Sequence, residues 1–107
     1  MKTINIVPLK LIEVIVDKFP NEIHKDLSLF LSYDKESKKY IALDNRHNWW
    51  FVEEYYSLTL AILYLLEENY RNISLLSLVD YKAKVFRSRI KSIANEDNIT
   101  SLLYMTF

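Results

Sequence analysis

A cluster of side chains capable of acid–base chemistry lies in the middle of the chain, around a short polar connection. It consists of Asp44, Arg46, His47 and Trp49, with Glu53 and Glu54 a few residues further on. A carboxylate beside an imidazole is the pairing used in general acid–base catalysis, so one hypothesis is a small hydrolase. The alternative is structural, because Asp, Asn and His collect in hairpin turns, where their side chains bond the local backbone. We favour the structural interpretation and predict no catalytic residue and no metal site, since one histidine with scattered carboxylates supplies too few convergent ligands.

Two adjacent tryptophans, Trp49 and Trp50, open the strand-like run that follows. Neighbouring residues of a strand point to opposite faces, so one indole should face the helices and the other should face away from them. We expect Trp50 to be the outward one. An uncovered outward indole would form an exposed aromatic patch of the kind that anchors protein interfaces; the alternative is that a terminal segment covers it. The residues predicted for such an interface are Trp49, Trp50, Tyr55, Tyr56, Arg46 and His47.

A basic run near the C-terminus offers a different chemistry, contact with nucleic acid. Its members are Lys82, Lys84, Arg87, Arg89 and Lys91, with no acid among them. On a helical projection they divide between the two flanks of an apolar seam, whereas a nucleic-acid-binding helix more usually gathers its cations opposite the core. Flanking positions suit long side chains whose stems lie over apolar surface. Nucleic-acid binding through this run is therefore the alternative function, after protein interaction.

Residue types that the chain lacks exclude several classes of protein. The 107 residues contain no glycine and no cysteine. A phosphate-binding P-loop, a glycine-rich dinucleotide turn, a G-x-S-x-G nucleophile elbow, a disulfide and a thiolate nucleophile are therefore excluded, and we expect no cofactor. Without glycine, we expect Asn and Asp to occupy the left-handed backbone positions. The net charge is zero, so no global field draws the chain to nucleic acid or membrane.

The periodicity of apolar residues predicts the elements that position these groups. The stretch 40–69 reads as two paired strands leading into an almost wholly apolar helix, with Ser57 as its N-cap. In order we expect a β-like lead at 3–7, a helix between Pro8 and Pro20, strands at 27–33, 40–44 and 49–56, helices at 58–66 and about 75–94, and a final segment at 99–107, a strand rather than a helix. The stretch 34–39 has no apolar residue and should form a charged turn across which Tyr33 and Tyr40 face each other. In the last helix the apolar residues recur at steps of three and four and form one seam: Leu76, Val79, Ala83, Phe86, Ile90 and Ile93. The longest apolar run, 60–66, is far shorter than the ~20 residues that a bilayer requires.

These patterns predict a single α+β domain. Its order is a helix, a three-stranded antiparallel meander, two helices and a short C-terminal segment, with the helices packed on one face of the sheet. The predicted function is a small, non-enzymatic, cytoplasmic protein-interaction module whose partner is another protein or a second copy of the chain. An inhibitor or accessory factor encoded by a phage or mobile element, such as an anti-defence protein, fits this size and lack of cofactors.

Overall fold

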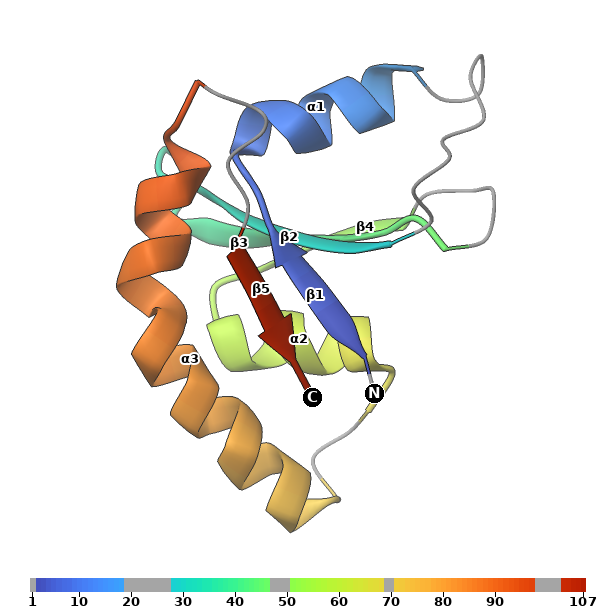
Figure 1. The fold of residues 1–107 in the computed structure, drawn as a ribbon, viewed down its shortest axis with the longest axis vertical. Helices are drawn as coiled ribbons and strands as arrows, with labels where there is room; N and C mark the ends of the chain where they lie inside the picture. The colour runs from blue at the N-terminus through green and yellow to red at the C-terminus, as the bar shows by residue number, and fades with distance from the viewer. Residues whose placement is uncertain (1, 19–27, 47–50, 69–70, 98–102) are drawn as a thin grey trace.

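The computed structural model describes residues 2–18, 28–46, 51–68, 71–97 and 103–107. Within them the elements follow in the order β1 (Thr3–Ile6), α1 (Leu9–Lys18), β2 (Leu29–Asp34), β3 (Lys39–Asp44), β4 (Phe51–Tyr55), α2 (Leu58–Leu66), α3 (Ile73–Ala94) and β5 (Leu103–Thr106). The strands form one mixed sheet in the order β4-β3-β2-β1-β5, and the three helices pack against it (Figure 1). The α+β class predicted from the sequence is confirmed. None of the helices in the described ranges is long and apolar enough to cross a membrane.

The predicted antiparallel meander is formed by β2, β3 and β4. Tyr33 pairs with Tyr40 across the first hairpin, as the charged turn between them indicates, and their rings lie 4.9 Å apart between centroids. In the second hairpin Asp44 pairs with Phe51. The tip of that hairpin, residues 47–50, lies outside the described residues. The meander therefore places Asp44, the last residue of β3, opposite Phe51, the first residue of β4.

The sheet is larger than predicted, because both ends of the chain join it. Strand β1 pairs in parallel with β2, and β5 pairs antiparallel with β1. Beyond these strands, Lys2 and Phe107 exchange two backbone hydrogen bonds of 3.0 and 2.9 Å. The two terminal segments thus form the last two strands at one side of the sheet, and they do not cover its face.

Helices cover both faces of the sheet. Helices α2 and α3 share one face, as predicted, and there they bury Leu29, Leu31 and Ala42. Helix α1 lies on the opposite face, above the sheet in Figure 1, where Ile12 and Ile15 belong to a second cluster. The strands supply a separate apolar surface for this cluster in Phe30, Ile41 and Leu43. The prediction that the helices pack on one face of the sheet is therefore corrected for α1. The opposite face can also bury a helix, because β2 and β3 have apolar side chains on both sides of the sheet.

Helix α2 begins and ends with defined caps and is buried over most of its surface. The Ser57 hydroxyl accepts a hydrogen bond from the backbone N–H of Leu60 at 3.2 Å, which confirms the predicted N-cap. The buried seam of α3, which includes Val79, Ala83 and Ile90, belongs to the same core as α2. The seam predicted from the three- and four-residue spacing is thus confirmed.

Two residues of the described ranges have a left-handed backbone, and neither is Asn or Asp. They are Lys38, with φ 60°, and Glu67, with φ 57°. Glu67 lies at the C-terminal end of α2, where its N–H bonds the Tyr64 carbonyl and the N–H of Glu68 bonds the Leu63 carbonyl. This is the bonding of a Schellman motif, in which glycine is usual. The expectation that Asn and Asp occupy the left-handed positions is therefore wrong at both of these residues.

Candidate functional sites

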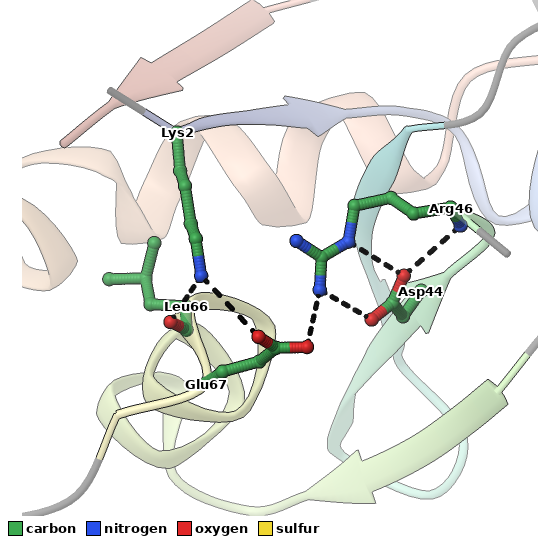
Figure 2. A network of polar contacts seen from close by, with 5 residues as sticks. All are labelled: Lys2, Asp44, Arg46, Leu66 and Glu67. Atoms are coloured by element: carbon green, nitrogen blue, oxygen red, sulfur yellow. Dashed lines mark hydrogen bonds and ion pairs between the residues drawn. The ribbon is translucent and has the colours of Figure 1, made fainter.

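A polar network joins the end of β3, the end of α2 and the start of β1 (Figure 2). The Arg46 guanidinium donates from Nε to Asp44 Oδ1 at 3.0 Å and from Nη2 to Asp44 Oδ2 at 2.9 Å. The same Nη2 donates to Glu67 Oε1 at 2.7 Å. Lys2 completes the network, because its Nζ donates to the Leu66 carbonyl at 2.6 Å and lies 3.8 Å from Glu67 Oε2. These bonds stabilise the αL cap of α2 from two other elements.

The network places part of the predicted acid–base cluster in a structural role. The Asp44 side chain is only 11% exposed and its carboxylate accepts the forked Arg46 hydrogen bonds. These bonds raise the pKa of Arg46 above its ordinary value, although partial burial acts in the opposite direction. The Asp44 carboxylate is therefore engaged with a charged partner at the end of β3. His47 lies outside the described residues, as do Trp49 and Trp50.

A second site is a hollow at the end of the sheet, between the β2–β3 turn, the start of α2 and the C-terminal half of α3. We name it the basic hollow; its volume is about 320 Å³. Its lining consists of three tyrosines, three cations and the first residues of α2: Tyr33, Tyr40, Tyr56, Lys38, Arg87, Lys91, Ser57 and Leu58. None of these lining residues is acidic. The hollow is therefore a concave, cationic and aromatic surface.

Contacts within the hollow hold its cations in place. Lys91 Nζ lies 5.0 Å from the centroid of the Tyr33 ring, within the range of a cation–π interaction. Arg87 interacts with the nearly buried Tyr40 through its charge and a side-chain hydrogen bond. Burial raises the pKa of Tyr40 above its ordinary value of 10.0, and Arg87 partly offsets this rise. Arg87 and Lys91 are thus each held against a tyrosine of the hollow.

The five predicted nucleic-acid residues do not form one surface. Arg87 and Lys91 line the basic hollow. Lys82 instead donates to the Thr106 carbonyl and lies 4.6 Å from the Phe107 ring centroid, beside β5. Arg89 lies 5.9 Å from the Phe86 ring centroid. Lys84 is exposed and does not line the hollow. Two of the five residues, Arg87 and Lys91, therefore converge on the basic hollow.

The third candidate is the outer edge of β4. This strand is at the end of the sheet, and within the described ranges its only partner strand is β3. Phe51 is 50% exposed, and the side chains of Glu53 and Glu54 are also exposed. Of the predicted interface residues, Tyr55 packs against Tyr64 with centroids 5.9 Å apart, whereas Tyr56 is 74% exposed and has Lys39 Nζ 5.1 Å from its ring centroid. The exposed aromatic surface is thus at Phe51 and Tyr56, on either side of Tyr55.

Several residues of these sites were not predicted as site residues: Tyr33, Tyr40, Lys38 and Leu58 in the basic hollow, and Lys2 and Glu67 in the polar network. The signal for the two tyrosines was present, because the charged turn predicted that they pair. The role of Lys38 could be recognised only from the structure of the β2–β3 turn, which places it in the basic hollow. Phe51 likewise gained its importance from the position of β4 at the edge of the sheet.

Comparison of the chain with protein-family models, with curated proteins and with solved structures found no match. In the part of the chain that the structure describes, no group of three or more His, Cys, Asp or Glu side chains could hold a metal ion.

Proposed function

We propose that the chain is a non-enzymatic, cytoplasmic protein-interaction module that binds an extended segment of a partner along the outer edge of β4. The observation that carries this proposal is a half-exposed Phe51 on a strand that, in the described part of the chain, pairs on one side only. A partner segment can add to an edge strand as a further strand through backbone hydrogen bonds. The exposed aromatic ring supplies apolar contact beside those hydrogen bonds.

The charges of β4 favour a basic partner over a second copy of the chain. Glu53 and Glu54 are adjacent on the strand and exposed. Antiparallel pairing of two β4 edges around a two-fold axis would bring the acids of both copies close together, and facing like charges destabilise a strand pair. A segment with Lys or Arg at two adjacent positions would instead place one cation beside each carboxylate, because neighbouring residues of a strand point to opposite faces. Lys39, whose Nζ lies 3.9 Å from Glu54, shows how a cation fits beside this strand.

The test is selection of extended peptides from a random display library on the full chain, followed by affinity measurement. We expect basic peptides to be enriched, and we expect Phe51→Ser and Glu53→Lys each to weaken their binding about tenfold or more. Val85→Ser on α3 is the matched control, because Val85 is 51% exposed, much like Phe51. The proposal is wrong if no basic peptide is selected, or if Val85→Ser weakens binding as much as Phe51→Ser.

The alternative partner is a second copy of the chain, and sedimentation of the full chain tests it by measuring the oligomeric state. A dimer that Phe51→Ser dissociates would show that a second copy occupies the β4 edge, contrary to the charge argument. A monomer leaves the edge available to another protein. The narrower prediction, an inhibitor or accessory factor of phage or mobile-element type, is then tested by whether the captured partner loses its own activity when the chain binds it.

A further inference from the structure

The basic hollow combines features that recognise an anionic ligand. Lys38 comes from the β2–β3 turn, and Arg87 and Lys91 come from α3, so cations from two distant parts of the sequence meet at one concavity. None of the described side chains that line the hollow is acidic, so the charges of these three cations are not neutralised within the hollow itself. A phosphate group, with a charge of about −1.5 to −2 at neutral pH and several acceptor oxygens, matches such a cluster.

The start of α2 adds to this positive field. Ser57 and Leu58, where the helix begins, both line the hollow. The Ser57 hydroxyl bonds the N–H of Leu60, and the carbonyl of Ser57 bonds the N–H of Ala61. The earlier N–H groups of a helix have no intrahelical acceptor, and the positive end of the helix dipole lies there. An anion between Leu58 and the cations of α3 would therefore be stabilised from two sides.

The size and aromatic lining of the hollow indicate more than a simple anion. A volume of about 320 Å³ lies at the lower end of the range for small-molecule sites, about 300 to 1,000 Å³. Tyr56 at its margin is 74% exposed, and Lys39 Nζ lies over one face of its ring, so a planar group would stack on the opposite face. Stacking of a nucleobase on an aromatic ring is independent of sequence and contributes about 1 to 3 kcal/mol.

We propose that the basic hollow binds a nucleotide unit, with its phosphate held by Lys38, Arg87 and Lys91 and its base stacked on Tyr56. A free mononucleotide and one nucleotide of a single strand share this chemistry. A duplex does not fit the proposal, because its phosphates need cations spread along a groove, whereas Lys82 and Arg89 are engaged elsewhere on α3. The site shares Tyr56 with the exposed aromatic surface beside β4, but it does not depend on the protein-interaction proposal.

Calorimetric titration of the full chain tests the ligand class with five probes. They are adenosine 5′-monophosphate, adenosine, inorganic phosphate, a single-stranded pentanucleotide and a DNA duplex. We expect the monophosphate and the pentanucleotide to bind, with affinities that fall as salt rises, and the other three to bind at least about tenfold more weakly. A pentanucleotide that binds tenfold tighter than the monophosphate identifies a strand as the ligand, and equal affinities identify a free nucleotide. Inorganic phosphate or duplex binding as tightly as the monophosphate would overturn the proposal, as would the absence of monophosphate and pentanucleotide binding.

Variants of one helix locate the binding. Arg87→Gln with Lys91→Gln should weaken monophosphate binding about tenfold or more, because two charge-assisted bonds are removed. Lys84→Gln with Arg89→Gln removes the same charge from the same helix outside the hollow and should leave the affinity unchanged. Tyr56→Ala should weaken binding of the monophosphate but not that of inorganic phosphate. Equal losses in the two charge variants, or no loss in the first, would contradict the assignment.

A second variant keeps the test valid if loss of the Arg87–Tyr40 contact prevents folding. Lys38→Gly removes a cation of the hollow at a position whose left-handed backbone glycine adopts without strain. We expect this variant to fold and to bind the monophosphate more weakly than the parent chain. Unchanged affinity in folded Lys38→Gly would exclude Lys38 from the site and overturn the proposed phosphate clamp.

Discussion

Arg46 Nη2 donates a 2.7 Å hydrogen bond to Glu67 Oε1, although 21 residues separate them in the sequence. This bond connects the end of β3 to the left-handed residue that ends α2 (Figure 2). The Asp44 carboxylate accepts from Arg46 Nε and from the same Nη2, so the three charges act as one unit. Removal of the central cation therefore affects two carboxylates at once.

Arg46→Ala should lower the free energy of unfolding by about 2 kcal/mol, because hydrogen bonds to charged groups contribute about 1.5 to 3 kcal/mol. Glu67→Ala should cost less, since the Glu67 side chain is 59% exposed and solvent screens its charge. Urea denaturation of both single variants and the double variant gives their coupling energy. Lys10→Ala is the control, because its ion pair with Asp97 joins side chains that are 60% and 90% exposed. Equal effects of Arg46→Ala and Lys10→Ala would show that the network does not stabilise the fold.

Leu63→Asp should prevent cooperative folding. Leu63 lies in the middle of α2 and is 3% exposed, so the new carboxylate would be buried without a partner. Leu63→Ala should be milder, with a loss of about 2 to 5 kcal/mol. Leu78→Asp, at a 40% exposed position on α3, is the control for an acid placed on a helix. A cooperative thermal melt of Leu63→Asp close to that of the parent chain would contradict the burial of α2.

Lys38→Gly should stabilise the fold by about 1 kcal/mol. A residue with a Cβ pays roughly 1 to 2 kcal/mol in the left-handed region, and glycine avoids this cost while it adds some unfolded-state entropy. Lys35→Gly in the same turn is the control, because Lys35 has no positive φ and its substitution should destabilise the fold. The measurement is the denaturant midpoint of both variants. Destabilisation of Lys38→Gly would mean that its side chain contributes more than its backbone strain costs.

Stability should fall as the pH rises above about 10. Burial raises the pKa values of Tyr40 and Tyr64 above their ordinary 10.0. A folded-state pKa above the unfolded one favours the protonated side chain in the fold, so this contribution is complete below pH 10.0 and is lost as the pH passes the raised values. Melting temperatures from pH 8 to 11 should therefore decline, and Tyr40→Phe with Tyr64→Phe should decline less steeply. The exposed Tyr81 supplies the control Tyr81→Phe, which should follow the parent chain.

Local patterns predicted the elements because their signals lie within a few residues. The three- and four-residue spacing of apolar positions predicted α3, and Ser57 before an apolar run predicted the start of α2. The charged turn after Tyr33 predicted its pairing with Tyr40. Each of these features depends on neighbouring residues, whose geometry the backbone period fixes.

Pairings between distant segments carried no comparable signal. Nothing within the β1 sequence specifies that Ile4 pairs with Leu29 on one side and with Met105 on the other. The sequence did contain a signal for the position of α1. The strand residues Phe30, Ile41 and Leu43 are apolar on the face opposite to Leu29 and Leu31, which indicates that this face is also buried. The basic hollow could not be predicted from local sequence, because Lys38 and Lys91 come together only when the β2–β3 hairpin packs against α3.

The pairing of β5 with β1 also affects the order in which this chain folds. Lys2 meets Phe107 only after nearly the whole chain has closed into a loop, and contacts of such long sequence separation form late and slow the folding of a domain. Until β5 arrives, β1 presents the open edge of a sheet whose Ile4 and Ile6 are fully buried in the finished fold. We therefore expect β5 to join the sheet late in folding. Aggregation of folding intermediates should increase when Met105 of β5 is replaced by a charged residue.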